Sequence, residues 1–173
     1  MGVLQELKET LKMGARGNKY LVMLAAPIGV TDDFQINTIA KGGSIPAKTV
    51  GQIEIWTQGR KLVVAGDATY ENAWTLTFWN TEDMALRKGF DDWMLHIDNM
   101  ETHTRGVSSH TEYMTDGGQI SQLNTTDNTI AATYTFYNMW PTGISAIDMA
   151  DDQQDMITEF TVDFAYSHWV RTK

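Results

Sequence analysis

Four histidines are the side chains of this sequence best suited to bind a metal ion or to carry a proton. They are His96, His103, His110 and His168. Three of them recur at intervals of seven residues, which fits none of the usual Cys and His spacings of zinc sites. The chain has no cysteine, so thiolate ligands, cysteine nucleophiles and disulfides are excluded. We therefore expect neither a metal site nor a cofactor.

Acidic side chains are the next candidate for chemistry. One cluster consists of Asp148, Asp151, Asp152 and Asp155. It lacks the central glycine and the bidentate glutamate of a helix–loop–helix calcium site, so a solvated acidic turn is the better interpretation. The carboxylates within 67–71 and 91–92 are close only in sequence, and no nucleophile elbow, phosphate loop or dinucleotide fingerprint is present. These patterns predict a protein that is not an enzyme.

Tryptophans could form an aromatic platform for a sugar. Trp74 alternates with polar residues, on the same face of a predicted strand as Leu76 and Phe78, whereas Trp93 lies on the apolar stripe of a predicted helix. Trp79 falls on the other face of that strand. We therefore expect core packing, on the strength of Trp74 and Trp93, rather than a platform of Trp74, Trp79 and Trp93. A monomeric carbohydrate-binding β-sandwich stays open as an alternative function.

Length and charge restrict the class of protein. The 173 residues, 42% of them hydrophobic, fit a single domain over 1–173. Their net charge of −9 argues against a grip on nucleic acid phosphates, which needs clustered Lys and Arg. The longest apolar runs, such as 21–30, are too short and too broken by Pro and Gly to span a bilayer, and the first residues lack the pattern of a signal peptide. Synthesis and assembly in a cytoplasm is the expectation.

Two segments have the periodicity of amphipathic helices. Leu4, Leu7 and Leu11 recur at three- and four-residue intervals, which predicts a short helix over 2–13 within an N-terminal arm, 1–17. Because an isolated helix of this length is marginal in water, its apolar stripe must dock on its own domain or on a neighbouring subunit.

The longer helix is predicted over 81–97. Its apolar stripe consists of Leu86, Phe90, Trp93, Met94 and Ile97. Asn80 or Thr81 is expected to cap its first turn by accepting from free backbone N–H groups.

Strands account for most of the rest. The expected strands lie at 19–24, 34–40, 51–57, 60–65, 72–79, 129–140 and 157–169. A tight hairpin is expected between the third and fourth, and a turn at 141–143. The polar excursion 99–128 has weaker strand patterns near 112–114 and 119–123. The sum predicts a mainly β fold, an antiparallel sandwich or small barrel with one long helix and a short N-terminal helix.

The last strand shows the clearest alternation. Phe160, Val162, Phe164 and Tyr166 share one face, with smaller or polar residues between them. A strand this close to a chain end is expected at or near a sheet margin, where unpaired N–H and C=O groups can bind another chain.

Three segments resemble one family in their order and separation. They are RKLVVAGDATYENAWTLTFWNTEDMALRKGFDDW at 60–93, WPTGISAIDMADDQQDMITEFTVDFAYSHW at 140–169 and SIPAKTV at 44–50. Segment 60–93 resembles a strand, an AGD turn, a Trp-bearing strand and a helix that opens with acidic residues. Segment 140–169 resembles a Trp-Pro-Thr turn, an acidic link and a final strand. The set resembles the tail tube proteins of contractile-tailed bacteriophages, whose fold also resembles the tube protein of type VI secretion.

The resemblance implies a subunit of a hexameric ring. Rings would stack into a tube in the virion tail, assembled in the host cytoplasm, with the sheath, baseplate and tail terminator as partners and DNA passing through the lumen without specific binding. A tube of a type VI or tailocin-like injection system is the alternative within this class.

We expect the tube wall to be built from strands 51–65, 72–79 and 157–168, and ring-to-ring contacts to use the N-terminal helix, 41–50 and 99–128. The interface candidates are Leu4, Leu7, Leu11, Ile45, Pro46, Trp140, Pro141, Phe160, Val162 and Phe164.

Overall fold

The fold is that of a computed structural model, which describes residues 3–11, 14–25, 40–71, 73–99, 101–102, 104–150 and 156–173. The strand expected over 34–40 lies outside these residues except at its last position. In chain order the elements are α1 (Val3–Leu11), β1 (Tyr20–Met23), β2 (Ala40–Gly43), β3 (Lys48–Thr57), β4 (Arg60–Tyr70), β5 (Ala73–Trp79), α2 (Ala85–Ile97), the 3-10 helix η2 (His110–Glu112), β6 (Gly118–Leu123), β7 (Ile130–Tyr137), β8 (Trp140–Ile144), β9 (Glu159–Ala165) and β10 (His168–Arg171).

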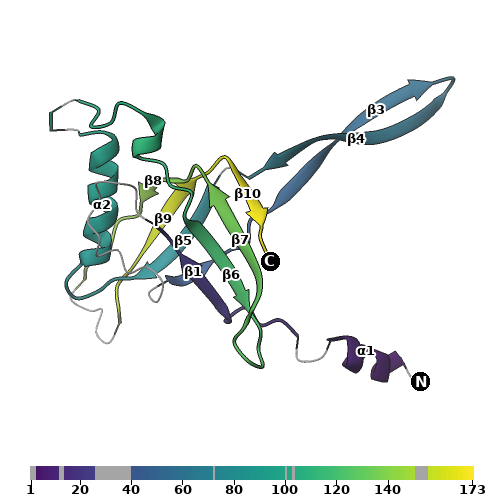
Figure 1. The fold of residues 1–173 in the computed structure, drawn as a ribbon, viewed down its shortest axis with the longest axis horizontal. Helices are drawn as coiled ribbons and strands as arrows, with labels where there is room; N and C mark the ends of the chain where they lie inside the picture. Colours follow the sequence, from purple (N-terminus) through teal and green to yellow (C-terminus); the bar gives the residue numbers. More distant parts are fainter. Residues whose placement is uncertain are drawn as a thin grey trace.

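The strands of the described residues form two four-stranded sheets and a separate hairpin. The sheet orders are β1-β6-β7-β10 and β2-β5-β9-β8, and all neighbours pair antiparallel. Of the strands described, only β4 pairs with β3. Figure 1 shows this hairpin projecting well beyond the two sheets. The expected mainly β, antiparallel fold with two helices is confirmed.

The core is built from the alternation of β5 and β9. In the antiparallel register Trp74 lies opposite Phe164, and Phe78 lies opposite Phe160. The buried side chains of both strands share one face of the sheet, since successive residues of a strand point to opposite faces. The ring of Trp74 stacks on that of Phe136 in β7, with 4.1 Å between centroids. This contact joins the two sheets into a sandwich.

Helix α2 closes one end of the sandwich beside β8 (Figure 1). Its stripe buries Leu86, Phe90 and Trp93, as predicted. The Phe90 ring contacts Phe78 and Phe160, so the helix packs on the same sheet face that meets β7. The fold thus has one continuous apolar core between two sheets and a helix.

The cap predicted for this helix is wrong. The helix begins at Ala85, after Met84 in the left-handed region at φ 52°, and the Met84 side chain makes no capping hydrogen bond. The Asp83 carboxylate accepts from the Ala85 N–H at 3.2 Å instead. Residues 81–84 form a turn closed by the Met84 N–H to the Thr81 carbonyl, so the helix starts four residues later than predicted, and Asn80 and Thr81 lie too far upstream to cap it.

Three predicted strand features also need correction. Pro141 and Gly143 do not turn the chain: they lie within β8, an edge strand, where a missing N–H is tolerated. Residues 112–114 form no strand, because a single turn of 3-10 helix ends at Glu112. The strand expected over 157–169 at or near a sheet margin is two strands: β9 lies between β5 and the edge strand β8, and β10 forms an edge of the other sheet.

Candidate assembly surfaces

Each four-stranded sheet leaves two strands paired on one side only among the described residues. These edge strands are β1 and β10 in one sheet and β2 and β8 in the other. An edge strand presents free N–H and C=O groups that can pair with another chain. The edges therefore make a first candidate surface for assembly.

The β3–β4 hairpin is turned by two residues, Gln58 and Gly59. Both have positive φ, 48° and 74°, the combination that a two-residue turn of type I′ needs to match the twist of its strands. The expected tight hairpin is confirmed. Ten residues of β3 and eleven of β4 extend this ladder, and almost none of their side chains is buried. Within the described part of the chain, no other strand pairs with this hairpin. An isolated two-stranded hairpin is only marginally stable in water, so we expect a partner from outside these residues.

The two faces of the hairpin differ in character. On one face Ile53 lies opposite Val64, and Ile55 lies opposite Leu62, all four exposed. On the other face Lys61 pairs with Glu54 and lies over the ring of Trp56. We call the first set, Ile53, Ile55, Leu62 and Val64, the hairpin apolar face. A contiguous exposed apolar patch of this kind typically marks an interaction site.

Helix α1 stands away from the sheets on the side opposite α2 (Figure 1). Its leucines are exposed in this chain, at 74% for Leu4, 53% for Leu7 and 57% for Leu11. The predicted helix is therefore confirmed, whereas docking of its stripe on its own domain is not what the structure shows.

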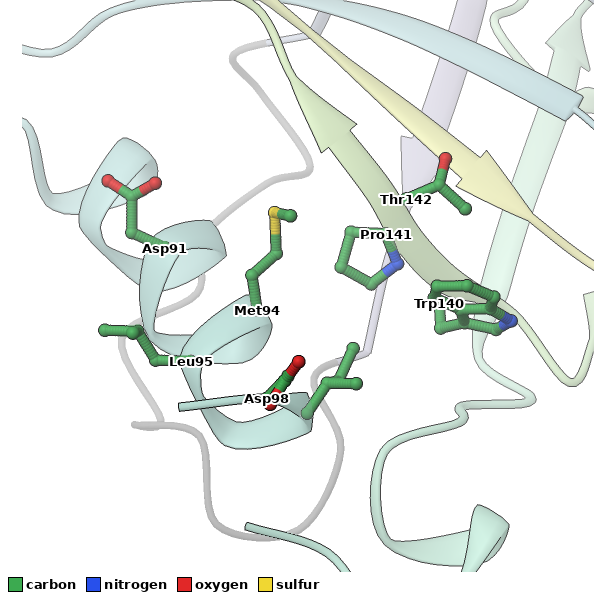
Figure 2. Close-up of a pocket in the computed structure, with 8 residues that line it drawn as sticks. Asp91, Met94, Leu95, Asp98, Trp140, Pro141 and Thr142 are labelled. Carbon is green, nitrogen blue, oxygen red and sulfur yellow. The ribbon is translucent and has the colours of Figure 1, made fainter. Parts of the chain in front are cut away.

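A hollow of about 520 Å³ lies between α2 and β8, as Figure 2 shows. It is lined by Asp91, Met94, Leu95, Ile97, Asp98, Trp140, Pro141 and Thr142. Side chains from the outer face of α2 form one wall and the first residues of β8 form the other. We call it the α2–β8 groove.

The predicted interface residues fall into three groups. Leu4, Leu7, Leu11 and Ile45 are exposed, and Pro46 is half-buried. Trp140 and Pro141 line the α2–β8 groove. Phe160, Val162 and Phe164 are buried in the core of the chain itself.

Segment 99–128 was expected to serve contacts rather than the core, and part of that expectation is wrong. Strand β6 lies between β1 and β7, where Ile120 is buried in the core. Strands β5 and β9, both expected in the tube wall, are direct neighbours in one sheet. Sequence analysis does not single out the hairpin apolar face. Its pattern is nevertheless present, since Ile53 and Ile55, and likewise Leu62 and Val64, occupy alternate positions of IEIW and KLVV.

Local hydrogen bonds lower the pKa of the acidic side chains Glu112 and Asp127. The backbone N–H and then the hydroxyl of Ser108 donate to the Glu112 carboxylate, at 2.9 and 3.0 Å, and lower its pKa. The hydroxyl and then the backbone N–H of Thr129 lower the pKa of Asp127 in the same way. Both carboxylates stabilise turns, at η2 and between β6 and β7.

Within the described residues, the candidate side chains do not come together as a metal site. Among the described residues, no three His, Asp or Glu side chains gather as metal ligands; His103 and residues 151–155 lie outside that part of the chain. Trp74 and Trp93 are buried as predicted, and Trp79, on the other face of β5, is 40% exposed. None of the described helices is both long and apolar enough to cross a membrane.

Comparisons with known proteins agree on one family. The family model described as phage tail tube protein matches residues 15–172. The chain is 27% identical to tail tube protein gp19 of Enterobacteria phage T4 over 155 residues, which cover 90% of each chain.

Solved structures share the fold at low identity. A chain of the six-fold symmetrised baseplate of the anti-feeding prophage is 16% identical, with a TM-score of 0.63 over 91% of this chain and 94% of that one. A chain of the sheath–tube complex of an extracellular contractile injection system is 13% identical, with a TM-score of 0.59 over 99% and 97%. With the family match spanning nearly the whole chain, this protein belongs to the phage tail tube protein family, a family of structural components of the virion tail and not of enzymes.

Proposed function

We propose that copies of this chain close into six-membered rings, and that the rings stack into the inner tube of a contractile tail through which DNA is ejected. The observation that carries the proposal is the set of sheet edges that the described residues leave unpaired. Because β1 and β10 lie on opposite margins of one sheet, and β2 and β8 on opposite margins of the other, an edge of one copy can pair with a different edge of the next.

Such a contact is heterologous, and a heterologous contact gives a ring when its rotation closes. Closure also removes the free edges, which otherwise template uncontrolled association. The fold likeness to a chain of a six-fold symmetrised assembly supports a ring of six.

The hairpin apolar face supports contact with a further copy. The four side chains Ile53, Ile55, Leu62 and Val64 gain little from their own chain because the hairpin projects from it. Burial against a neighbouring subunit would remove this apolar area from water, at roughly 25 cal/mol per Å².

The proposed tube has protein partners and lets DNA pass through its lumen. The likeness to a chain of a sheath–tube complex supports a surrounding sheath, with the baseplate and tail terminator at the two ends. The net charge of −9 per copy gives an acidic wall that repels DNA and lets it pass without specific binding.

The injection-system alternative draws on the same fold likeness. It would be distinguished by its cargo, an effector protein in place of a genome. The carbohydrate-binding alternative loses two of its three platform residues, since Trp74 and Trp93 are buried in the core and only Trp79 of the three is exposed.

Negative-stain electron microscopy of the purified full chain tests the proposal. Hollow rings with six-fold class averages, or tubes of stacked rings, are the expected result. Sedimentation at the same concentrations should show species far larger than 19.5 kDa. A monomer that persists at high protein concentration and in several salt conditions would contradict it.

A further inference from the structure

Helix α1 precedes the family match, which begins at residue 15, so the family model says nothing of the helix. We argue its function from its own residues. Leu4, Leu7 and Leu11 form one exposed stripe. At 100° per residue, Lys8 flanks this stripe, whereas Glu6 and Glu9 fall on the opposite side of the helix. The surface that needs a partner is thus apolar with a cation at its margin.

The α2–β8 groove has the complementary character. Its floor and walls are apolar, with Met94, Leu95 and Trp140 among them. Its rim carries Asp91 and Asp98 (Figure 2). Arg87 approaches Asp91 at 3.5 Å, whereas no cation among the described residues forms an ion pair with Asp98. The groove is therefore an apolar trough with unneutralised negative charge at one end.

Length fits as well as charge. The leucine stripe extends over seven residue steps, Leu4 to Leu11, which is about 10.5 Å along a helix. The face of α2 that lines the groove also extends over seven steps, from Asp91 to Asp98. Two such stripes can lie side by side as packed helices, at the usual separation of about 8 to 10 Å between axes.

A copy cannot place its own α1 in its own groove. The segment after α1 is held to the β6–β7 end of the sandwich, because Thr125 donates to the Gly14 carbonyl at 3.1 Å and Gln122 donates to the Arg16 carbonyl at 2.9 Å. Only two residues separate Leu11 from Gly14, and the sheets lie between α1 and α2 (Figure 1). The occupant must come from elsewhere.

We infer that the α2–β8 groove of one copy receives helix α1 of a second copy. The leucine stripe enters the apolar trough and Lys8 faces the Asp98 end. Because the helix and the groove lie on opposite sides of the same molecule, each copy donates one helix and accepts another. The contact therefore repeats from copy to copy and links each copy to the next. This inference rests on the proposed tube, in which many copies lie adjacent.

Cysteine cross-linking tests the contact directly, since the chain contains no native cysteine. A tagged Leu7→Cys copy is co-assembled with an untagged Leu95→Cys copy and then mildly oxidised. Both positions are exposed in the single subunit, so the substitutions leave its core intact. A disulfide requires Cα atoms within about 7 Å. The expected product is a mixed dimer of tagged and untagged chains on a non-reducing gel.

The matched control is Glu6→Cys with Leu95→Cys, which places the thiol on the opposite side of α1. The control should cross-link several-fold less. Equal yields from the two pairs, or no mixed dimer from either in samples where microscopy shows tubes, would overturn the inference and leave the proposed tube intact. Absence of rings and tubes in the unmodified protein contradicts the tube and removes the basis of the inference with it.

Hydrogen exchange provides a further measurement on the unmodified chain. Amide exchange should slow on assembly both in residues 3–11 and in residues 91–98, because each surface covers the other. Unchanged exchange at 3–11 in assembled protein would also overturn the inference.

Discussion

Aromatic side chains that point inward from β5, β9 and α2 account for the subunit's stability. The Phe164 ring lies 5.8 Å from that of Phe90 and 6.0 Å from that of Trp74. Phe160 and Val162 are buried on the same face. The prediction that these three β9 residues meet another copy rested on their alternation near a chain end. That pattern equally describes a central strand, and the register places it there.

Phe164→Ala should lower the free energy of unfolding of the isolated subunit by about 3–5 kcal/mol, the usual cost of removing a large buried aromatic ring. Denaturant unfolding followed by tryptophan fluorescence would measure it. Ile157→Ala, at an exposed position, is the control and should change stability by less than about 0.5 kcal/mol. A Phe164→Ala subunit of normal stability that fails only in assembly would show that this ring serves an interface after all.

Among the elements, the hairpin is the one whose substitutions we expect to separate folding from assembly. Its turn and ladder are set by local sequence, whereas its apolar face is left exposed by the described part of the chain. Substitutions there should act on association and leave the subunit fold unchanged.

Leu62→Lys places a charge on the hairpin apolar face and should abolish rings and tubes in electron micrographs, because burying an unpaired charge costs about several kcal/mol. The neighbouring Val63→Lys lies on the other face, opposite Glu54, where a cation is favourable. It is the matched control and should assemble normally. Assembly of both variants would show that the face stays in solvent.

Elements with a strong period could be predicted from the sequence, and those fixed by distant contacts could not. The alternation of Trp74, Leu76 and Phe78 predicts β5, and the stripe of Leu86, Phe90 and Trp93 predicts α2, because both patterns directly record the buried face. For residues 141–143 the sequence predicts a turn, because proline and glycine are typical turn residues. Pro141 is compatible with a strand only at a sheet edge, and which strand lies at an edge depends on pairing between distant segments.

Sites assembled from distant segments gave weaker signals still. The α2–β8 groove joins Leu95 to Trp140, which are far apart in sequence and share no common period. The predicted start of α2 is wrong for another reason. Met84 adopts a left-handed conformation that its residue type does not indicate. Leu4, Leu7 and Leu11 were predicted correctly as an apolar stripe of a helix, but no period in the sequence indicates what covers it.

The whole molecule combines a net negative charge with two elements that project from its sandwich. The 22 acidic residues outnumber the 13 basic ones, and the chain extends a helix and a hairpin away from its sandwich in different directions (Figure 1). In the proposed tube, the helix and the hairpin would each contact a neighbouring copy, and the net negative charge would repel polyanions.

The assembled protein should not retain double-stranded DNA in a gel-shift or filter-binding assay at a physiological salt concentration of about 0.15 M. Nonspecific binders show dissociation constants of about 10⁻⁴ to 10⁻⁶ M under such conditions, and their affinity falls steeply with salt. A comparable affinity with that salt dependence would contradict free passage of DNA through the tube.

The base of the hairpin carries an irregularity: the register shifts between Val50 and Gln52, so that β4 has one residue more than β3 there. Gly51 and Gly66 approach so closely that a Cβ on Gly66 would lie 3.2 Å from the Gly51 carbonyl carbon. A bulge of this kind bends its strand and increases the local twist, so this extra residue sets the direction in which the hairpin leaves the body. Deleting Asp67 would leave a single residue of β4 opposite Gly51 and straighten the base of the hairpin, which would move its tip relative to the two sheets.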